Sequence, residues 1–385
     1  MSGKIVCIGD LHFGQPKLSA ESLYMKLRAC LYKQLIDADV LFITGDLFDQ
    51  LLTINSKAYK FASMFIRDML TIAKDTGMLL RILHGTFTHD RDQISVFSTW
   101  AESVPEFKVI NEITAETIQM HDGDDLHVGY LPDNLPYKYS SDAISQLKTV
   151  MTVAGYGYLD VLIGHGTFEH VLPPGINKPS CLYTVSQFKD IVHGPLIFGH
   201  VHTPSVYKNM YYCGSFDRMS HGEEEDKGYR IFTVDSDHHW TSEFITNPYT
   251  VCFKSMAFKE TDPVRIVHEF KSSIPEMFPS GKGYVRVIHP DAETRSLLHQ
   301  VCSDNFPDIV YSAKSSADVN PDTTESLKID DGIKCDEVES IIPNAVNLGD
   351  LIYRYLEKKQ FLGSTTRDEI VQEITDICSE AGHSD

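Results

Sequence analysis

In the first 200 residues, short apolar segments repeatedly end at or near a glycine that begins a polar loop. Five of them read as buried β-strands, at 4–9, 40–44, 79–83, 161–164 and 196–199. Four end in glycine followed by aspartate or histidine, and the third runs through His84 and Gly85 to His89 and Asp90. Ligands of open α/β sheets collect beyond the carboxyl ends of the strands, so we expect these polar residues to converge there.

The segments between the strands have the spacing of amphipathic helices, at 20–37 and 56–74, which indicates an α/β fold. Further strands are expected at 228–234, 240–245 and 251–258. A second, smaller unit then alternates strand-like and helical segments up to about residue 313. The sequence therefore predicts four regions: a main domain at 1–248, a small domain at 249–314, an acidic linker at 315–347 and two terminal helices within 348–385.

The composition is that of a soluble globular chain, with 42% apolar and 23% charged residues. The net charge is −20, and residues 316–385 contribute −10 of it through 16 acidic and 6 basic residues. Such a chain does not bind polyanions by bulk charge alone. The eight cysteines are scattered, which favours reduced thiols. With no signal-peptide pattern at the start, we expect a cytoplasmic protein, or one in the host cytoplasm if it comes from a phage.

The polar residues after the strands have the types and spacing of metal ligands. Pairs separated by one residue in a tight loop can point the same way, and four such loops supply two carboxylates and four imidazoles: Asp10, His12, Asp46, His165, His200 and His202. Oxygen and nitrogen ligands without thiolate suit Mn²⁺, Fe²⁺ or Zn²⁺. Two such ions can hold the attacking and leaving oxygens of a displacement at phosphorus.

Taken together, these motifs resemble the calcineurin-like metallophosphoesterases. The motifs are GDLH at 9–12, GDLFD at 45–49, the His-Asp pair at 89–90, GHG at 164–166 and GHVH at 199–202. The resemblance implies a β-sandwich core with flanking helices and two divalent metal ions, most often Mn²⁺. It implies that Asp10, His12 and His202 bind one ion, that His165 and His200 bind the other, and that Asp46 bridges them.

The same resemblance assigns two catalytic residues and exposes one departure. His89 takes the place of the histidine that contacts the scissile phosphate and assists the leaving group. Asp49 takes the place of the acid that orients this histidine. The family motif is Gly-Asn-His-Asp, whereas this chain has Thr88 directly before His89. We therefore place Thr88 where the family has a metal-binding asparagine, and expect a weaker second metal site.

A later segment narrows the resemblance to SbcD-type DNA repair nucleases and the related phage recombination endonuclease subunits. It contains Tyr212, Gly214-Ser215, Arg218, Glu223 and Lys227-Gly228. The small domain is similar to their α+β capping domain, and the terminal helices to their ATPase-binding element. The resemblance implies an enzyme with exonuclease and endonuclease activity in DNA recombination and repair, acting as a homodimer within a heterotetramer with an SbcC-like coiled-coil ATPase.

Two other function classes remain open at this point. A generic metallophosphatase or cyclic-nucleotide phosphodiesterase would share every metal motif, and a scaffold protein with this fold would need lost ligands. The remaining twelve histidines, such as His84 and His221, read as surface or hydrogen-bonded groups. Arg218 and Lys227 fit either phosphate contacts or ordinary ion pairs.

Overall fold

The structure is a computed structural model that describes residues 3–100, 103–121, 124–133, 139–172, 182–258, 262–289 and 291–315. The chain divides into two compact units, Met1–Leu327 and Lys328–Asp385. The described residues all belong to the first unit. The acidic linker, except Ser315, and the two terminal helices expected from the sequence lie outside the described residues.

Two six-stranded sheets form the main part of the first unit. The first has the order β14 (Trp240–Thr246), β13 (Gly228–Val234), β1 (Gly3–Ile8), β2 (Val40–Ile43), β3 (Leu79–Leu83) and β4 (Phe107–Ile110). The second has the order β11 (Ser205–Tyr207), β12 (Met210–Tyr212), β10 (Leu196–Gly199), β7 (Val161–His165), β6 (Asp125–Leu131) and β5 (Thr114–Gln119). Strands β1, β2 and β3 pair in parallel, as do β7 and β10. The strands predicted from apolar runs are therefore all present.

Alternation along the strands directs apolar side chains into different layers. In β1, Ile5 and Cys7 belong to a core cluster that also contains Val128 and Ile163 of the second sheet, so the two sheets share one interior. Val6 and Ile8 point the other way and pack with α1 and α3. The arrangement is an α/β fold in which two sheets face each other and helices cover their outer faces.

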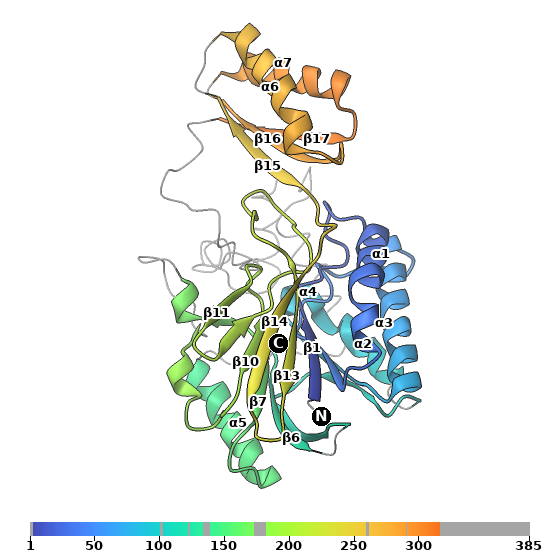
Figure 1. Ribbon diagram of the computed structural model, residues 1–385, viewed down its shortest axis with the longest axis vertical. Helices are drawn as coiled ribbons and strands as arrows, with labels where there is room; N and C mark the ends of the chain where they lie inside the picture. Colours follow the sequence, from blue (N-terminus) through green and yellow to red (C-terminus); the bar gives the residue numbers. More distant parts are fainter. Residues whose placement is uncertain are drawn as a thin grey trace, which may run out of the picture. The chain divides into compact units, whose positions relative to one another are not determined.

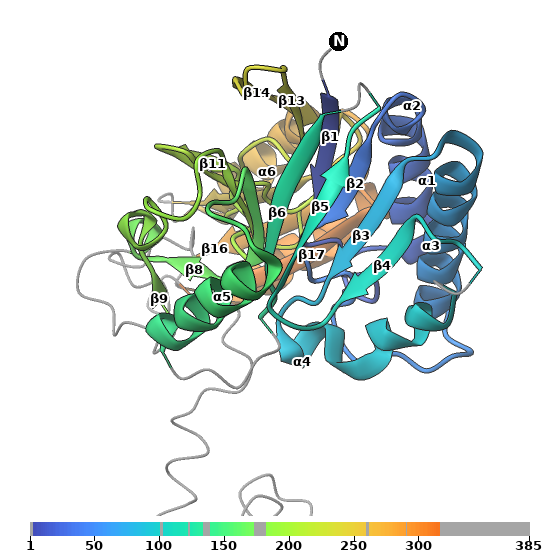
Figure 2. The ribbon, with the colours of Figure 1, turned by 90° about the horizontal axis from the view of Figure 1, so that it is seen from below.

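The helices on the first sheet are α1 (Ala20–Cys30), α2 (Tyr32–Leu35) and α3 (Lys57–Thr76), with α1 and α3 side by side in Figure 2. The single helix expected at 20–37 is interrupted at Leu31. Helix α5 (Ser140–Ala154) packs Ile144, Leu147 and Met151 on the second sheet. The short α4 (Phe87–Asp90), the 3₁₀ segments Arg91–Trp100, Glu169–Val171 and Val185–Gln187, and the strands β8 (Thr167–Phe168) and β9 (Leu182–Tyr183) complete this part.

The smaller domain has a sheet and a core of its own (Figure 1). Its elements are β15 (Phe253–Ala257), α6 (Pro263–Met277), β16 (Gly283–Ile288), α7 (Ala292–Asn305) and β17 (Ile309–Lys314). The three strands are all parallel, with a helix in each connection. The predicted α+β arrangement is therefore wrong for this domain, because parallel neighbours require crossover helices and give an α/β unit.

Among the helices that the structure describes, none is both long and apolar enough to cross a membrane.

Candidate metal centre

The predicted metal ligands follow strands whose carboxyl ends meet. Asp10 and His12 follow β1, Asp46 follows β2, His165 ends β7, and His200 and His202 follow β10. Hydrogen bonds join the first two loops, from Asp10 N to Gly45 O at 3.1 Å and from His12 N to Asp46 O at 3.0 Å. The parallel pairing within each sheet thus brings loops that are distant in the sequence to one place.

Four of these residues have a backbone conformation that L-residues rarely adopt. The φ angles are 50° at Asp10, 48° at His12, 51° at Asp46 and 92° at His200. Positive φ angles at non-glycine residues cost free energy and cluster at functional sites. Their concentration in one set of loops is a sign of function that is independent of residue type.

Glycines next to the ligands leave room for them. A Cβ atom on Gly45, where φ is 100°, would lie 2.4 Å from Nδ1 of His165. A Cβ atom on Gly85 would lie 2.2 Å from Oδ1 of Asp46. Gly45 and Gly85 are therefore required by close packing against the side chains of His165 and Asp46.

Within the described residues, three groups could each hold a metal ion, with all ligand atoms of a group within 4.8 Å of one another. The groups are Asp10, His12 and His202; His12, Asp46 and His89; and Asp46, His165 and His200. All six histidine and aspartate ligands expected from the sequence are thus brought together. Asp46 belongs to two groups, as a bridging carboxylate would.

One half of the centre contains Asp46, His165 and His200. Nε2 of His165 lies 3.2 Å from Oδ2 of Asp46, and its Nδ1 donates to the carbonyl of Thr44 at 2.8 Å. Burial alone would lower the pKa of His165, but Asp46 raises it to about 10. Burial and the neighbouring His165 lower the pKa of His200 to about 3. Although burial alone would raise the pKa of Asp46, His165 and His12 hold it below its usual range.

Thr86 contributes a hydroxyl to this half. Oγ1 of Thr86 lies 3.4 Å from Oδ2 of Asp46, 3.2 Å from Nε2 of His165 and 3.3 Å from Nδ1 of His200. Oγ1 of Thr88 is buried and has no hydrogen-bond partner among the described residues. The hydroxyl of Thr86, which follows Gly85 directly, therefore lies among these ligands, and the placement of Thr88 as a ligand stays a prediction.

The other half contains Asp10, His12 and His202. Nε2 of His12 lies 3.1 Å from Nε2 of His202 and 3.7 Å from Oδ2 of Asp46. Oδ1 of Asp10 accepts a hydrogen bond from the backbone N–H of His200 at 2.9 Å. Oδ2 of Asp10 is buried and has no hydrogen-bond partner in the part of the chain that is described.

These features fit divalent cations. A buried carboxylate oxygen without a donor is costly unless a cation or a donor occupies the space beside it. Two imidazole nitrogens 3.1 Å apart can both present lone pairs when a cation lies beside them. The donor set of carboxylate, imidazole and hydroxyl groups suits a borderline or hard metal such as Mn²⁺.

Asp49 and His89 are joined through the backbone of Asp49. Nδ1 of His89 donates to the backbone carbonyl of Asp49 at 2.6 Å. Oδ1 of Asp49 instead faces Nδ1 of His12 at 3.3 Å, the nitrogen opposite the one that faces His202. The backbone carbonyl of Asp49 thus holds His89, and its carboxylate lies beside His12, while the role expected for this carboxylate stays a prediction.

Asp90 is an organising residue that the sequence patterns did not single out for this role. Its buried carboxylate accepts hydrogen bonds from the backbone N–H groups of Asp46 (3.0 Å), Phe48 (3.0 Å) and Gly85 (2.8 Å). Burial and the nearby Asp46 raise the pKa of Asp90. Asp90 thus ties the loops after β2 and β3 together. The only sequence signal for this role was its position directly after His89.

Comparison with known proteins adds little. No family model matches the chain, and no curated protein matches it. One solved structure is similar with a TM-score of 0.35 and 12% sequence identity, over 64% of this chain and all of its own.

Proposed function

We propose that the chain is a dinuclear-metal phosphodiesterase of the calcineurin-like metallophosphoesterase fold, and that its substrate is DNA. The observation that carries this proposal is the convergence of six ligands into two halves, which a third group links through His12 and Asp46. The facing sheets with helices outside support the same fold. The sequence resemblance to SbcD-type nucleases supports DNA as the substrate and an SbcC-like ATPase as the partner.

The residues of the centre have distinct tasks in this reaction. When bound, two divalent cations would polarise the phosphoryl oxygen and lower the pKa of an attacking water. Asp46 holds the two halves together, and the other five ligands fix the geometry. His89 lies beside His12, with ring centroids 4.8 Å apart. Because Nδ1 of His89 donates to a carbonyl, the other ring nitrogen is the one that can transfer a proton to the leaving oxygen.

Digestion of end-labelled single- and double-stranded DNA with Mn²⁺, with and without the partner ATPase, tests this function. Asp46→Ala should abolish cleavage and lower the metal content, because Asp46 belongs to two of the three groups and lies beside both His165 and His12. The matched control is Asp92→Ala, which changes an exposed acid two residues from Asp90. Near-native cleavage by Asp46→Ala, after contaminating nucleases are excluded, would contradict the proposal.

Two further measurements separate the alternatives. Activity on a small aryl phosphate that equals the activity on DNA would favour a generic phosphatase. Wild-type protein that binds no metal would favour a scaffold.

A further inference from the structure

Lys227 is a buried lysine whose amino group binds the protein around a metal-ligand candidate. Its side chain is 0% exposed, directly before β13. Nζ donates to the backbone carbonyl of His202 at 2.9 Å and forms ion pairs with Glu223 Oε2 at 2.9 Å and Glu225 Oε1 at 2.7 Å. Three acceptors match the three N–H donors of an ammonium group, which removes the large cost of burying it unpaired.

Glu223 extends this support to the imidazole ring of His202. Its Oε1 lies 4.0 Å from Nδ1 of His202 and accepts a hydrogen bond from Ser220 Oγ at 2.8 Å. His202 is therefore held from two directions, with Lys227 at its carbonyl and Glu223 beside its ring.

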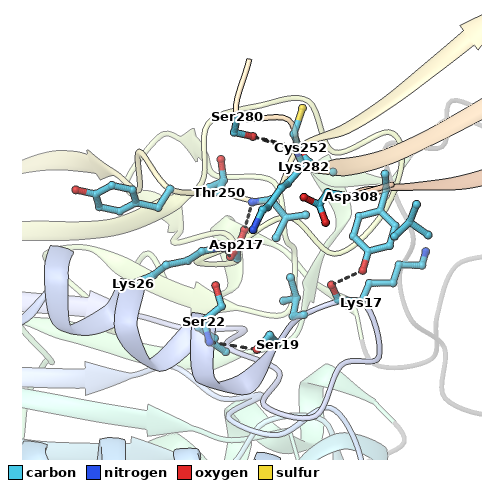
Figure 3. Close-up of a pocket in the computed structure, with 17 residues that line it drawn as sticks. Lys17, Ser19, Ser22, Lys26, Asp217, Thr250, Cys252, Ser280, Lys282 and Asp308 are labelled. Atoms are coloured by element: carbon cyan, nitrogen blue, oxygen red, sulfur yellow. Dashed lines mark hydrogen bonds and ion pairs between the residues drawn. The ribbon is translucent and has the colours of Figure 1, made fainter. Parts of the chain in front are cut away.

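The segment that carries Glu223 and Lys227 is itself fixed. The guanidinium of Arg218 donates to the carbonyl of Glu225 at 2.9 Å and to Oγ1 of Thr250 at 2.9 Å. The carboxylate of Asp217 pairs with Lys26 at 2.5 Å and accepts from the backbone N–H of Val251 at 2.7 Å. Figure 3 shows Asp217 between Lys26 and Thr250, in the wall of a pocket of about 400 Å³. The segment thus has anchors independent of the metal centre.

We propose that Lys227 is a positioning residue for one half of the metal centre: it holds His202 so that Nε2 of this histidine faces Asp10 and His12. The inference rests on the proposed two-metal function and adds that the two halves depend on different residues. Within the described residues, the amino group of Lys227 binds His202, Glu223 and Glu225, and none of these belongs to the group of Asp46, His165 and His200. Its loss should therefore weaken one cation and spare the other.

Simple electrostatics predicts the opposite change in cation affinity when Lys227 is replaced, and this makes the proposal testable. Lys227 places a positive charge near a cation site, and two carboxylates, Glu223 and Glu225, surround that charge. If charge alone mattered, Lys227→Met would leave these carboxylates uncompensated and tighten cation binding. If Lys227 positions His202, the same substitution misplaces a ligand and weakens binding.

The experiment measures Mn²⁺ binding to the full chain by equilibrium dialysis, with electron paramagnetic resonance to distinguish a coupled ion pair from a single ion. Wild-type protein should bind two ions. Lys227→Met should keep one ion at wild-type affinity and weaken the other by about 10- to 100-fold, the usual cost of losing support behind a ligand. Lys4→Met is the matched control, because it removes a lysine that pairs with Asp37 at 2.5 Å and supports no ligand candidate.

Tighter binding, or two ions at wild-type affinity in Lys227→Met, would overturn the proposal. If Lys227→Met does not fold, Glu223→Gln decides the question: it keeps the size of the side chain and should weaken the same single ion. Wild-type binding of both ions by that variant would also overturn the proposal. The Mn²⁺ binding experiment contains no DNA, so its result does not depend on nuclease activity. If the wild-type protein binds two ions but cleaves no DNA in the separate digestion assay, the proposed function fails and the role of Lys227 at the metal centre still stands.

Discussion

His165 and His202 lie in opposite halves of the candidate metal centre, and different parts of the protein hold them. His165 donates to a backbone carbonyl, that of Thr44, and faces Asp46, whose own loop is bound through backbone N–H groups to Asp90. His202 instead depends on charged side chains, Lys227 and Glu223. The first half is thus held through the backbone N–H and carbonyl groups of its loops, whereas the second is held by charged side chains behind one ligand.

Because of this difference, substitutions in the two halves should affect different properties: folding stability in one half and metal affinity in the other. The buried backbone N–H groups of a loop are part of the fold, so removing the side chain that accepts from several of them leaves those donors unpaired. Side chains behind a ligand can be removed while the strands remain paired, and the effect then falls on the metal. We therefore expect substitutions in the backbone-held half to cost folding free energy, and substitutions in the other half to cost metal affinity.

The largest effect should follow Asp90→Ala. This change removes the acceptor of three buried backbone N–H groups, and each unpaired group costs ~1–3 kcal/mol, so the free energy of unfolding should fall by about 3 kcal/mol or more. The urea midpoint of the metal-free protein measures the fall, and Asp92→Ala serves as the exposed control. A metal-free Asp90→Ala protein with a wild-type midpoint would show that Asp90 does not hold these loops.

The same contrast explains what the sequence could and could not predict. The six ligands lie directly after strands, so apolar runs and local motifs were enough to find them. Lys227 lies 25 positions after His202, and no local pattern shows that the two meet. The sequence patterns did not single out Thr86, because the motif was aligned on the residue directly before His89, whereas Thr86 precedes the single turn α4 that contains His89.

The elements of the fold follow the same rule. The all-parallel sheet of the small domain depends on hydrogen bonds between segments about 25 to 30 residues apart, so its strands were predicted but its α/β class was not. Strands β5 and β6 were not predicted. Residues such as Glu116 and Asp125 in them interrupt the apolar pattern, and Glu116 is stabilised there by Arg81, which pairs with it at 2.6 Å.

A smaller effect should follow Asp49→Ala, in the half held by side chains. The carboxylate faces His12, so its loss should weaken Mn²⁺ binding by about 10- to 100-fold with little change in the urea midpoint. His89 should keep its orientation, because its partner is the backbone carbonyl of Asp49, which alanine retains. Cleavage measured against Mn²⁺ concentration should therefore recover at high Mn²⁺. A lower rate that persists at saturating Mn²⁺ would instead return Asp49 to the role expected from the sequence.

The smallest effect should follow Thr86→Asn, which adds an amide oxygen to the backbone-held half. The hydroxyl of Thr86 already lies between Asp46, His165 and His200, so an amide carbonyl from the same position can approach a cation held by them. A carbonyl oxygen is a better neutral ligand for Mn²⁺ than a hydroxyl, and one improved ligand should tighten this ion by up to about tenfold, or ~1.4 kcal/mol. The ion held by Asp10, His12 and His202 should keep its affinity.

Thr88→Asn is the matched control for this prediction, since it makes the same change two residues away. Mn²⁺ titrations of both variants should show tighter binding of one ion in Thr86→Asn and unchanged binding in Thr88→Asn. The reverse result would place Thr88 beside the metal and would mean that the loop after β3 does not bring Thr86 to the ligands. Tighter binding of both ions in Thr86→Asn would mean that the two halves are not independent, because Asp46 would then transmit a change in one half to the other.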